Sequence, residues 1–232
     1  QAAATYLRAN EGTSEVGRHR PTETQTLEDY ISKNNLWFSR ENLGTFIGEG
    51  VEQRVYRFDS SHVIKLNTSV YYRSWKAYFN SLLLHNLFFA DTAYQLVGFI
   101  RYHGELHAVV KQSFIEATTK TDLLLVKKLM ADNGFLNKRN NDYYNPELGI
   151  ILEDLHDANV LTKDGVLYFI DTVFYLSNVE NRRLEEGGKL SKPLLNINDG
   201  YDYEGEAKEI ALRAQIITLP EGVKGTNCGN CL

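Results

Sequence analysis

Short strand-like runs joined by tight turns are the feature that most restricts how this chain can fold. The run Thr45–Phe58 is followed after a brief turn by His62–Asn67, and Tyr94–Tyr102 is followed in the same way by Leu106–Ile115. Strands linked over so few residues pair in an antiparallel manner. The first half of the sequence therefore predicts a sheet built from hairpins.

Apolar residues at helical spacing occur before, between and after these strand-like runs. The segments that have it are Thr26–Phe38, Ser69–Phe89, Thr119–Phe135 and Glu204–Ile217. The third has Thr121 or Asp122 near its start and Gly134 at its end, which are typical residues for helix termini. Residues 1–25 show no clear period, and we expect them to form a loosely held arm.

The order of these segments predicts an α+β chain in three parts. We expect an N-terminal extension at 1–40, a β-rich part with one helix at 41–116, and a last part at 117–232. The last part begins with a helix and contains a small cluster of strands and loops, in which the turn Lys163–Gly165 links two strands. A chain of 232 residues is long enough to bury a substantial core.

Composition excludes several other classes of protein. The net charge of −5 argues against a surface that binds nucleic acid, and no apolar run reaches the roughly 18 residues of a membrane span. The first residues lack the pattern of a secretory signal. Only Cys228 and Cys231 are present, so a disulfide framework is not expected and a cytoplasmic location fits best. This pair is either a free thiol pair or half of a metal site that a longer protein completes.

Two features of the first half suit a phosphate ligand. Gly48 and Gly50 stand two residues apart at the end of a strand, where glycines allow close approach of the backbone to an anion, although a plain hairpin turn has the same pattern. Lys65 stands in the middle of a strand between apolar neighbours. Its side chain either lies on the exposed face of the strand or points inward at phosphate oxygens.

The segment Gly149–Thr172 places oxygen-bearing side chains at the ends of apolar runs. Asp154 and Asn159 are five residues apart, and Asp171 follows behind the run Val166–Ile170. Amide and carboxylate oxygens are ligands that magnesium prefers, and a further carboxylate can accept or orient a hydroxyl proton. Positioned phosphates, a neutralising metal and an oriented nucleophile are what phosphoryl transfer requires.

The motif Asp154–Asn159, DLHDAN, resembles the catalytic loop of the protein-kinase-like fold. It is closer to the form found in aminoglycoside and choline phosphotransferases than to that of eukaryotic protein kinases. The chain as a whole resembles the kinase domains of polyvalent proteins from phages and conjugative elements. This resemblance implies a bilobal fold with an antiparallel N-lobe, a reduced and mainly helical C-lobe, and the cytoplasm of a bacterial cell as its location.

The resemblance also implies roles for individual residues. Asp154 would be the catalytic base, and Asn159 and Asp171 would bind magnesium. Lys65 would bind the phosphates of ATP. The remaining nucleotide contacts are expected at Gly48, Gly50, Val55 and Gln112, with Val55 over the adenine and the strand around Gln112 at its edge. The acceptor would be a hydroxyl group of a protein or a small molecule.

The sequence departs from the family pattern near Lys65. Gln53 replaces the third glycine of the loop, and no Glu or Asp lies between Lys65 and Asp91 to pair with the lysine. His85 and Asn86 are either hydrogen-bonded core residues or substitutes that position Lys65, and Asp171 is a further candidate partner. Three functions therefore stay open: an active ATP-dependent phosphotransferase, an inactive nucleotide-binding or interaction module, and a structural or cargo domain of a phage particle.

Overall fold

The computed structural model describes residues 19–50 and 53–177. These residues form antiparallel sheets with few helices, as the α+β prediction requires. The chain divides into two compact units, residues 1–116 and 117–232. None of the described helices is long and apolar enough to cross a lipid bilayer.

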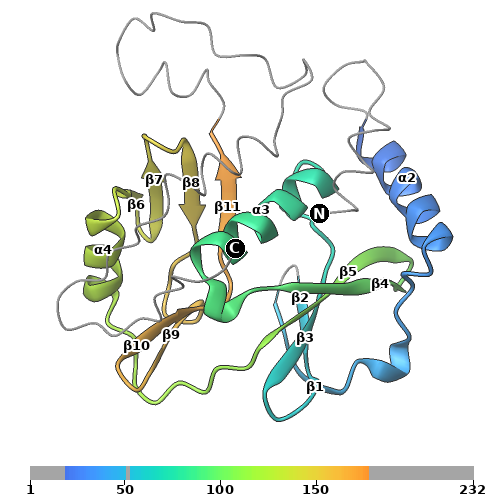
Figure 1. The fold of residues 1–232 in the computed structure, drawn as a ribbon, viewed down its shortest axis with the longest axis horizontal. Coiled ribbons are helices and arrows are strands. Elements are labelled where there is room, and N and C mark those ends of the chain that lie inside the picture. The colour runs from blue at the N-terminus through green and yellow to red at the C-terminus, as the bar shows by residue number, and fades with distance from the viewer. Residues whose placement is uncertain (1–18, 51–52, 178–232) are drawn as a thin grey trace, which may run out of the picture. The chain divides into compact units, whose positions relative to one another are not determined.

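The first unit is built on a five-stranded antiparallel sheet in the order β1-β2-β3-β5-β4 (Figure 1). Its strands are β1 (Thr45–Glu49), β2 (Gln53–Arg57), β3 (His62–Asn67), β4 (Gln95–Tyr102) and β5 (Glu105–Ser113). The predicted hairpins are all present. At the β4–β5 turn, His103 and Gly104 have φ angles of 50° and 86°, values that suit the tight turn of a two-stranded hairpin.

The central strands β3 and β5 are buried on both faces of the sheet, with alternate residues pointing to opposite sides. One face packs with Leu43 and the partly buried Phe38, and its strand residues are Tyr56, Ile64, Leu66, Ile100 and Val109. The other face meets helix α3 (Trp75–Phe88), where Phe99 packs edge-on against Trp75 and Phe79. This double burial explains why β3 reads as an almost continuous apolar run.

Helix α3 begins later than predicted, because Ser74 caps it. The Ser74 hydroxyl accepts a hydrogen bond from the N–H of Ala77 at 3.0 Å. Glu23 supplies the other cap: its carboxylate accepts the N–H groups of Trp75 and Lys76 at 2.8 and 2.9 Å. The N–H groups at the start of α3 therefore have partners, as a helix terminus requires.

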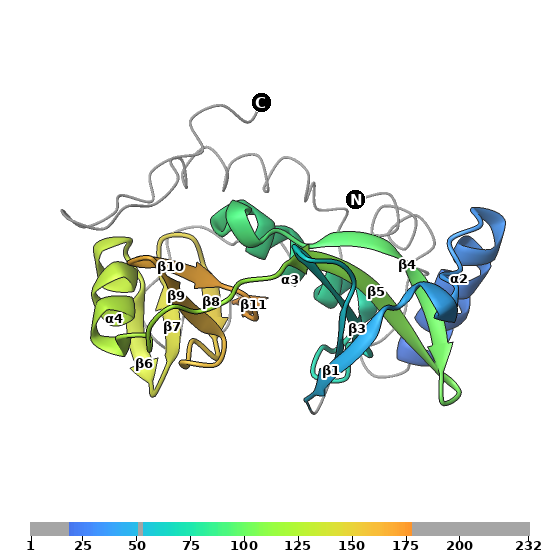
Figure 2. The same ribbon diagram turned by 90° about the horizontal axis from the view of Figure 1, so that it is seen from below.

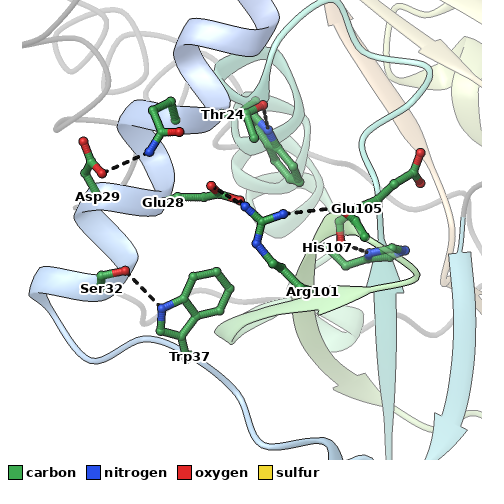
Figure 3. Close-up of polar contacts among 11 residues, drawn as sticks. Thr24, Glu28, Asp29, Ser32, Trp37, Arg101, Glu105 and His107 are labelled. Atoms are coloured by element: carbon green, nitrogen blue, oxygen red, sulfur yellow. Dashed lines mark hydrogen bonds and ion pairs between the residues drawn. The ribbon is translucent and has the colours of Figure 1, made fainter.

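Glu23 belongs to helix α2 (His19–Lys33), which lies near the β4 side of the sheet (Figure 2). Figure 3 shows Glu28 of this helix joined to Arg101 of β4. The Arg101 guanidinium lies 2.6 and 2.7 Å from the two Glu28 carboxylate oxygens, and the indole N–H of Trp75 donates to the Thr24 hydroxyl at 3.1 Å. The expectation of a loosely held arm is therefore wrong for residues 19–25. Glu23 and Thr24 bond Trp75, about fifty positions further along the chain, and these contacts hold the segment against α3.

Beyond α2, the chain runs along the outer edge of β4. The N–H of Phe38 donates to the carbonyl of Phe99 at 2.7 Å, and the N–H of Phe99 donates to the carbonyl of Leu36 at 2.9 Å. A Cβ at Gly98 would lie 2.7 Å from the Leu36 carbonyl oxygen, so only glycine permits this approach. The contact covers an edge that would otherwise be unpaired.

The described part of the second unit, residues 117–177, contains one helix and six strands. Helix α4 (Leu123–Asp132) has Asp122 as its N-cap and ends before Gly134, whose φ is 78°, as predicted. Strands form a four-stranded sheet in the order β11-β8-β7-β6 and the separate hairpin β9–β10. Their bounds are β6 (Leu136–Arg139), β7 (Asp142–Asn145), β8 (Ile150–Glu153), β9 (Val160–Lys163), β10 (Val166–Phe169) and β11 (Val173–Leu176).

The expectation of a mainly helical second part is not met within residues 117–177. The strands β6 and β7, which the sequence did not predict, account for much of the difference. All four residues of β6 are exposed, so this edge strand lacks the alternation of buried apolar and exposed polar residues by which strands are recognised. The predicted helix Glu204–Ile217 and the cysteines Cys228 and Cys231 lie outside the described residues.

Candidate active site

The β1–β2 hairpin carries both glycines of the predicted phosphate loop. Gly48 lies in β1 opposite Val55, next to an irregularity in the strand pairing. The N–H of Gly50 donates to the carbonyl of Gln53 at 2.8 Å. A Cβ at Gly48 would meet no atom within 4 Å, and one at Gly50 would only reach the Gln53 carbonyl at 3.9 Å. Nothing in the described residues therefore requires glycine here, and the bare backbone is open to a ligand.

Lys65 lies in the centre of the same sheet and is only 5% exposed. It pairs with the half-buried Val55 on β2 and with Val110 on β5. The interpretation that places Lys65 on an exposed strand face is therefore wrong. Its ammonium nitrogen lies 5.4 Å from the centre of the Tyr94 ring, so the side chain points toward the face that α3 covers.

The residues considered as substitutes for the missing glutamate both have hydrogen-bond partners beyond the end of α3. His85 is fully buried, and its Nε2 lies 3.0 Å from the carbonyl oxygen of Thr92. Asn86 bonds both backbone groups of Tyr94: its amide donates to the carbonyl at 2.8 Å and its oxygen accepts the N–H at 2.7 Å. Burial is the main cause that lowers the pKa of His85 to about 3, and the nearby Lys65 charge lowers it further.

Gln112 shares the Lys65 face of the sheet and is buried, with 2% of its surface exposed. Its Nε2 donates to the Thr92 carbonyl at 2.6 Å, the same oxygen that His85 meets. Its side-chain oxygen is buried and accepts no hydrogen bond from the residues that the structure describes. The side-chain nitrogen of Gln112 is thus bonded to the segment that follows α3.

In the second unit, Asp154 follows β8 at the start of the predicted catalytic loop. Its side chain is 57% exposed, and its backbone φ of 72° is unusual for a residue other than glycine. The surrounding loop maintains this conformation, because the N–H of Asp154 donates to the Asp142 carboxylate at 3.2 Å and its carbonyl accepts the N–H of His156 at 2.9 Å. Strained residues of this kind concentrate at functional sites.

Asn159 closes the loop back onto Asp154. Its Nδ2 donates to the Asp154 carbonyl at 2.9 Å and lies 3.3 Å from the Asp154 carboxylate oxygen Oδ2. His156 also holds the loop, since its Nδ1 accepts the N–H of Ala158 at 3.2 Å. The Oδ1 atom of Asn159 accepts no hydrogen bond from the described residues, which leaves that oxygen available to a cation.

The β9–β10 hairpin brings Asp171 next to this loop. The predicted turn is present, with Asp164 and Gly165 at φ angles of 51° and 79°. The pairing ends with the N–H of Ile170 donating to the carbonyl of Asn159 at 2.9 Å. Asp171 is therefore only one residue beyond the backbone partner of Asn159, so strand register brings two segments distant in sequence together.

The environment of the loop is acidic. Glu153, on β8, has a raised pKa because it is partly buried and because the carboxylates of Asp142 and Asp154 lie nearby. The described residues contain no group of three His, Cys, Asp or Glu side chains that could hold a metal ion by themselves. An amide oxygen with one carboxylate nevertheless suits magnesium, which keeps several waters and takes substrate phosphates as further ligands.

Two residues of these sites were not predicted from the sequence. Tyr94 begins the predicted strand Tyr94–Tyr102, and no sequence pattern marks it as a site residue, because its role depends on contacts with Lys65 and Asn86. Asp142 is the first residue of β7 and stands in a polar stretch, and only the fold shows that its carboxylate meets the backbone of Asp154. In neither case does sequence spacing reveal the partner.

Comparison with known proteins agrees with this arrangement. No curated protein matches the chain. The family described as "Serine/Threonine/Tyrosine Kinase found in polyvalent proteins" matches residues 20–178, which include the glycine hairpin, Lys65 and the acidic loop. The match covers more than half of the chain and begins inside α2. The chain belongs to this family of kinases found in polyvalent proteins.

Proposed function

We propose that the protein is an ATP-dependent phosphotransferase that moves the γ-phosphoryl group to a hydroxyl of a protein or a small molecule. The observation that carries the proposal is the loop around Asp154, in which Asn159 bonds Asp154 directly and pairs through its backbone with the residue before Asp171. The backbone pairing thereby brings Asp171 near the loop that contains Asp154 and Asn159, which supports a shared role for the three residues. This is the set that phosphoryl transfer requires.

Each of these three side chains has a separate role. The exposed carboxylate of Asp154 orients the acceptor hydroxyl and receives its proton as the hydroxyl oxygen bonds the γ-phosphorus and the bond from that phosphorus to ADP breaks, which releases ADP. Asn159 and Asp171 hold magnesium, which when bound neutralises phosphate charge and fixes the phosphates in position. Because Asn159 also bonds Asp154, the geometry of the metal ligand and that of the acceptor group are coupled.

The first unit supplies the nucleotide contacts. The backbone at Gly48 and Gly50 lies against the phosphates, since neither position carries a side chain to block the approach. Lys65 contributes a positive charge, and its burial strengthens the attraction because screening by water is weak there. Val55, the strand partner of Lys65, contacts the adenine ring, and the strand around Gln112 borders it.

Magnesium-dependent ATP turnover tests the proposal. We expect Asp154→Asn and Asp171→Asn to lower turnover by about 10²-fold or more, the usual contribution of a general base or charged group. Asparagine suits position 154 because it tolerates the positive φ that alanine does not. Asp157→Asn is the matched control, because Asp157 is an exposed acid of the same loop. Parent-level turnover in Asp154→Asn would contradict the assignment.

An inactive nucleotide-binding module is the second candidate. The absence of any acidic residue between Lys65 and Asp91 favours it, because helix α3 then has no carboxylate to pair with the lysine. Such a module would gain thermal stability from magnesium and ATP, yet neither the parent nor any variant would consume ATP. Turnover and nucleotide-induced stabilisation, measured on the same samples, separate the two candidates.

A further inference from the structure

The ammonium of Lys65 lies over an aromatic ring. Its Nζ is 5.4 Å from the centre of the Tyr94 ring, within the range in which a cation is attracted to the face of an aromatic ring. Lys65 is 5% exposed, so water screens this attraction little. Helix α3, which packs against the same face of the sheet, contains no acidic residue.

Tyr94 is fixed in place at its backbone. Asn86, near the end of α3, donates to the Tyr94 carbonyl at 2.8 Å and accepts its N–H at 2.7 Å. This pair of hydrogen bonds fixes the main chain at Tyr94, and so the point from which the Tyr94 side chain extends. The segment that carries Tyr94 is thereby tied to the helix.

A second set of contacts fixes the segment just before Tyr94. The carbonyl of Thr92 accepts the Nε2 hydrogen of Gln112 at 2.6 Å and lies 3.0 Å from Nε2 of His85. The His85 ring also packs against the Tyr94 ring, with 4.5 Å between their centres. His85 is fully buried and stays neutral, so this neighbour of Lys65 adds no second positive charge.

We propose that Tyr94 is a positioning residue for Lys65, and that its ring, held by Asn86, His85 and Gln112 through Thr92, orients the ammonium toward the nucleotide. The inference rests on the proposed function, because it assigns Lys65 to the phosphates. The face of the ring attracts the ammonium and limits the positions that it takes.

The test compares Tyr94→Phe with Tyr94→Leu. Phenylalanine keeps the ring, so its kcat/KM for ATP should stay within about threefold of the parent, whereas leucine should lower it about tenfold or more, the range expected when a desolvated cation–π contact is lost. Tyr102→Leu is the matched control, because Tyr102 contacts the Arg54 guanidinium at 4.8 Å in the same sheet but does not meet Lys65. Equal rates for Tyr94→Leu and the parent would overturn the proposal.

A second readout does not depend on activity. In the parent and in Tyr94→Phe, the ring should shift the ε-methylene proton signal of Lys65 upfield, and the signal is assigned by its loss in Lys65→Arg. In folded Tyr94→Leu the signal should return to the ordinary lysine position. If the parent shows the upfield shift but consumes no ATP, the proposed function fails while the contact stands. If the shift is the same in Tyr94→Leu, the contact itself is refuted.

Discussion

Individual glycines in this sheet serve different purposes. Gly98 is required by packing, since a Cβ there would lie 2.7 Å from a carbonyl oxygen. A Cβ at Gly48 would have no neighbour within 4 Å among the described residues, although glycine weakens a strand by its conformational freedom. A residue that the fold does not need is a candidate for a ligand contact.

This contrast leads to a prediction for Gly48→Ala. We expect its free energy of unfolding to be unchanged or higher by about 0.5–1 kcal/mol, because alanine restricts the unfolded chain. Its dissociation constant for magnesium–ATP should rise about tenfold, since the methyl group occupies space at the phosphates. Chemical denaturation and calorimetric titration measure the two quantities.

Gly98→Ala is the control for Gly48→Ala. Its Cβ would collide with backbone, so it should lose about 2 kcal/mol or more of stability. Its nucleotide affinity should not change while it remains folded. Unchanged affinity in Gly48→Ala would show that the hairpin does not contact the phosphates.

His85 should make stability depend on pH. Its pKa is about 3 in the folded protein, against 6.5 for the ordinary side chain, so between these values only the unfolded chain binds the proton. The free energy of unfolding should therefore fall as the pH is lowered from 6.5, by about 2 kcal/mol at pH 5. Urea denaturation between pH 7 and pH 5 measures this slope, and His85→Gln should remove this part of it. The same slope in both proteins would contradict the burial of a neutral imidazole.

At the scale of elements, helix α2 is a structural partner of α3. Glu23 accepts the first two N–H groups of α3, and the Ser74 hydroxyl accepts the next one, from Ala77. A carboxylate at a helix N-terminus also interacts favourably with the helix dipole. The position of α3, and with it that of His85 and Asn86, is therefore linked to the segment 19–33.

We predict that Glu23→Ala lowers the free energy of unfolding by about 1–2 kcal/mol, the usual loss for a helix cap combined with a charge at the helix end. Asp29→Ala is the control, because Asp29 is an exposed acid of the same helix that accepts a hydrogen bond from Gln25 one turn away, at 3.2 Å. Thermal denaturation of both variants is sufficient. An equal effect of the two substitutions would mean that the cap contributes nothing specific.

The elements that could be predicted are those fixed by neighbours in sequence. The Asp122 cap, the Gly134 stop and the turn Lys163–Gly165 depend on local backbone geometry, and all three are present. The start of α2 could not be predicted, because Glu23 and Thr24 find their partners more than fifty residues away. The orientation of Lys65 was undecidable for a similar reason: both faces of β3 are buried, so alternation does not distinguish them.

The same limit applies to the candidate site. The types and order of Asp154, Asn159 and Asp171 were visible, because each follows or precedes an apolar run. Their proximity depends on the β9–β10 register, which the turn fixes only once the strands have formed. The contact between Lys65 and Tyr94 depends on three elements at once, so no pattern in the sequence predicts it.

At the scale of the whole molecule, the proposed chemistry is divided between the two units. The glycine hairpin and Lys65 belong to residues 1–116, and the acidic loop belongs to residues 117–232. The family match extends across both. Transfer of the phosphoryl group therefore requires both sets of residues, and loss of either set should abolish it.

The most direct measurement is transfer of the terminal phosphate from γ-labelled ATP to components of a bacterial lysate whose own kinases have been inactivated by heat. With magnesium present, the parent protein should label at least one protein or small molecule, and Asp157→Asn should label it equally. Asp154→Asn and Lys65→Met should leave it unlabelled. Labelling that persists in Asp154→Asn would contradict the central claim, and so would a parent that binds ATP but transfers no phosphate to water or to any acceptor.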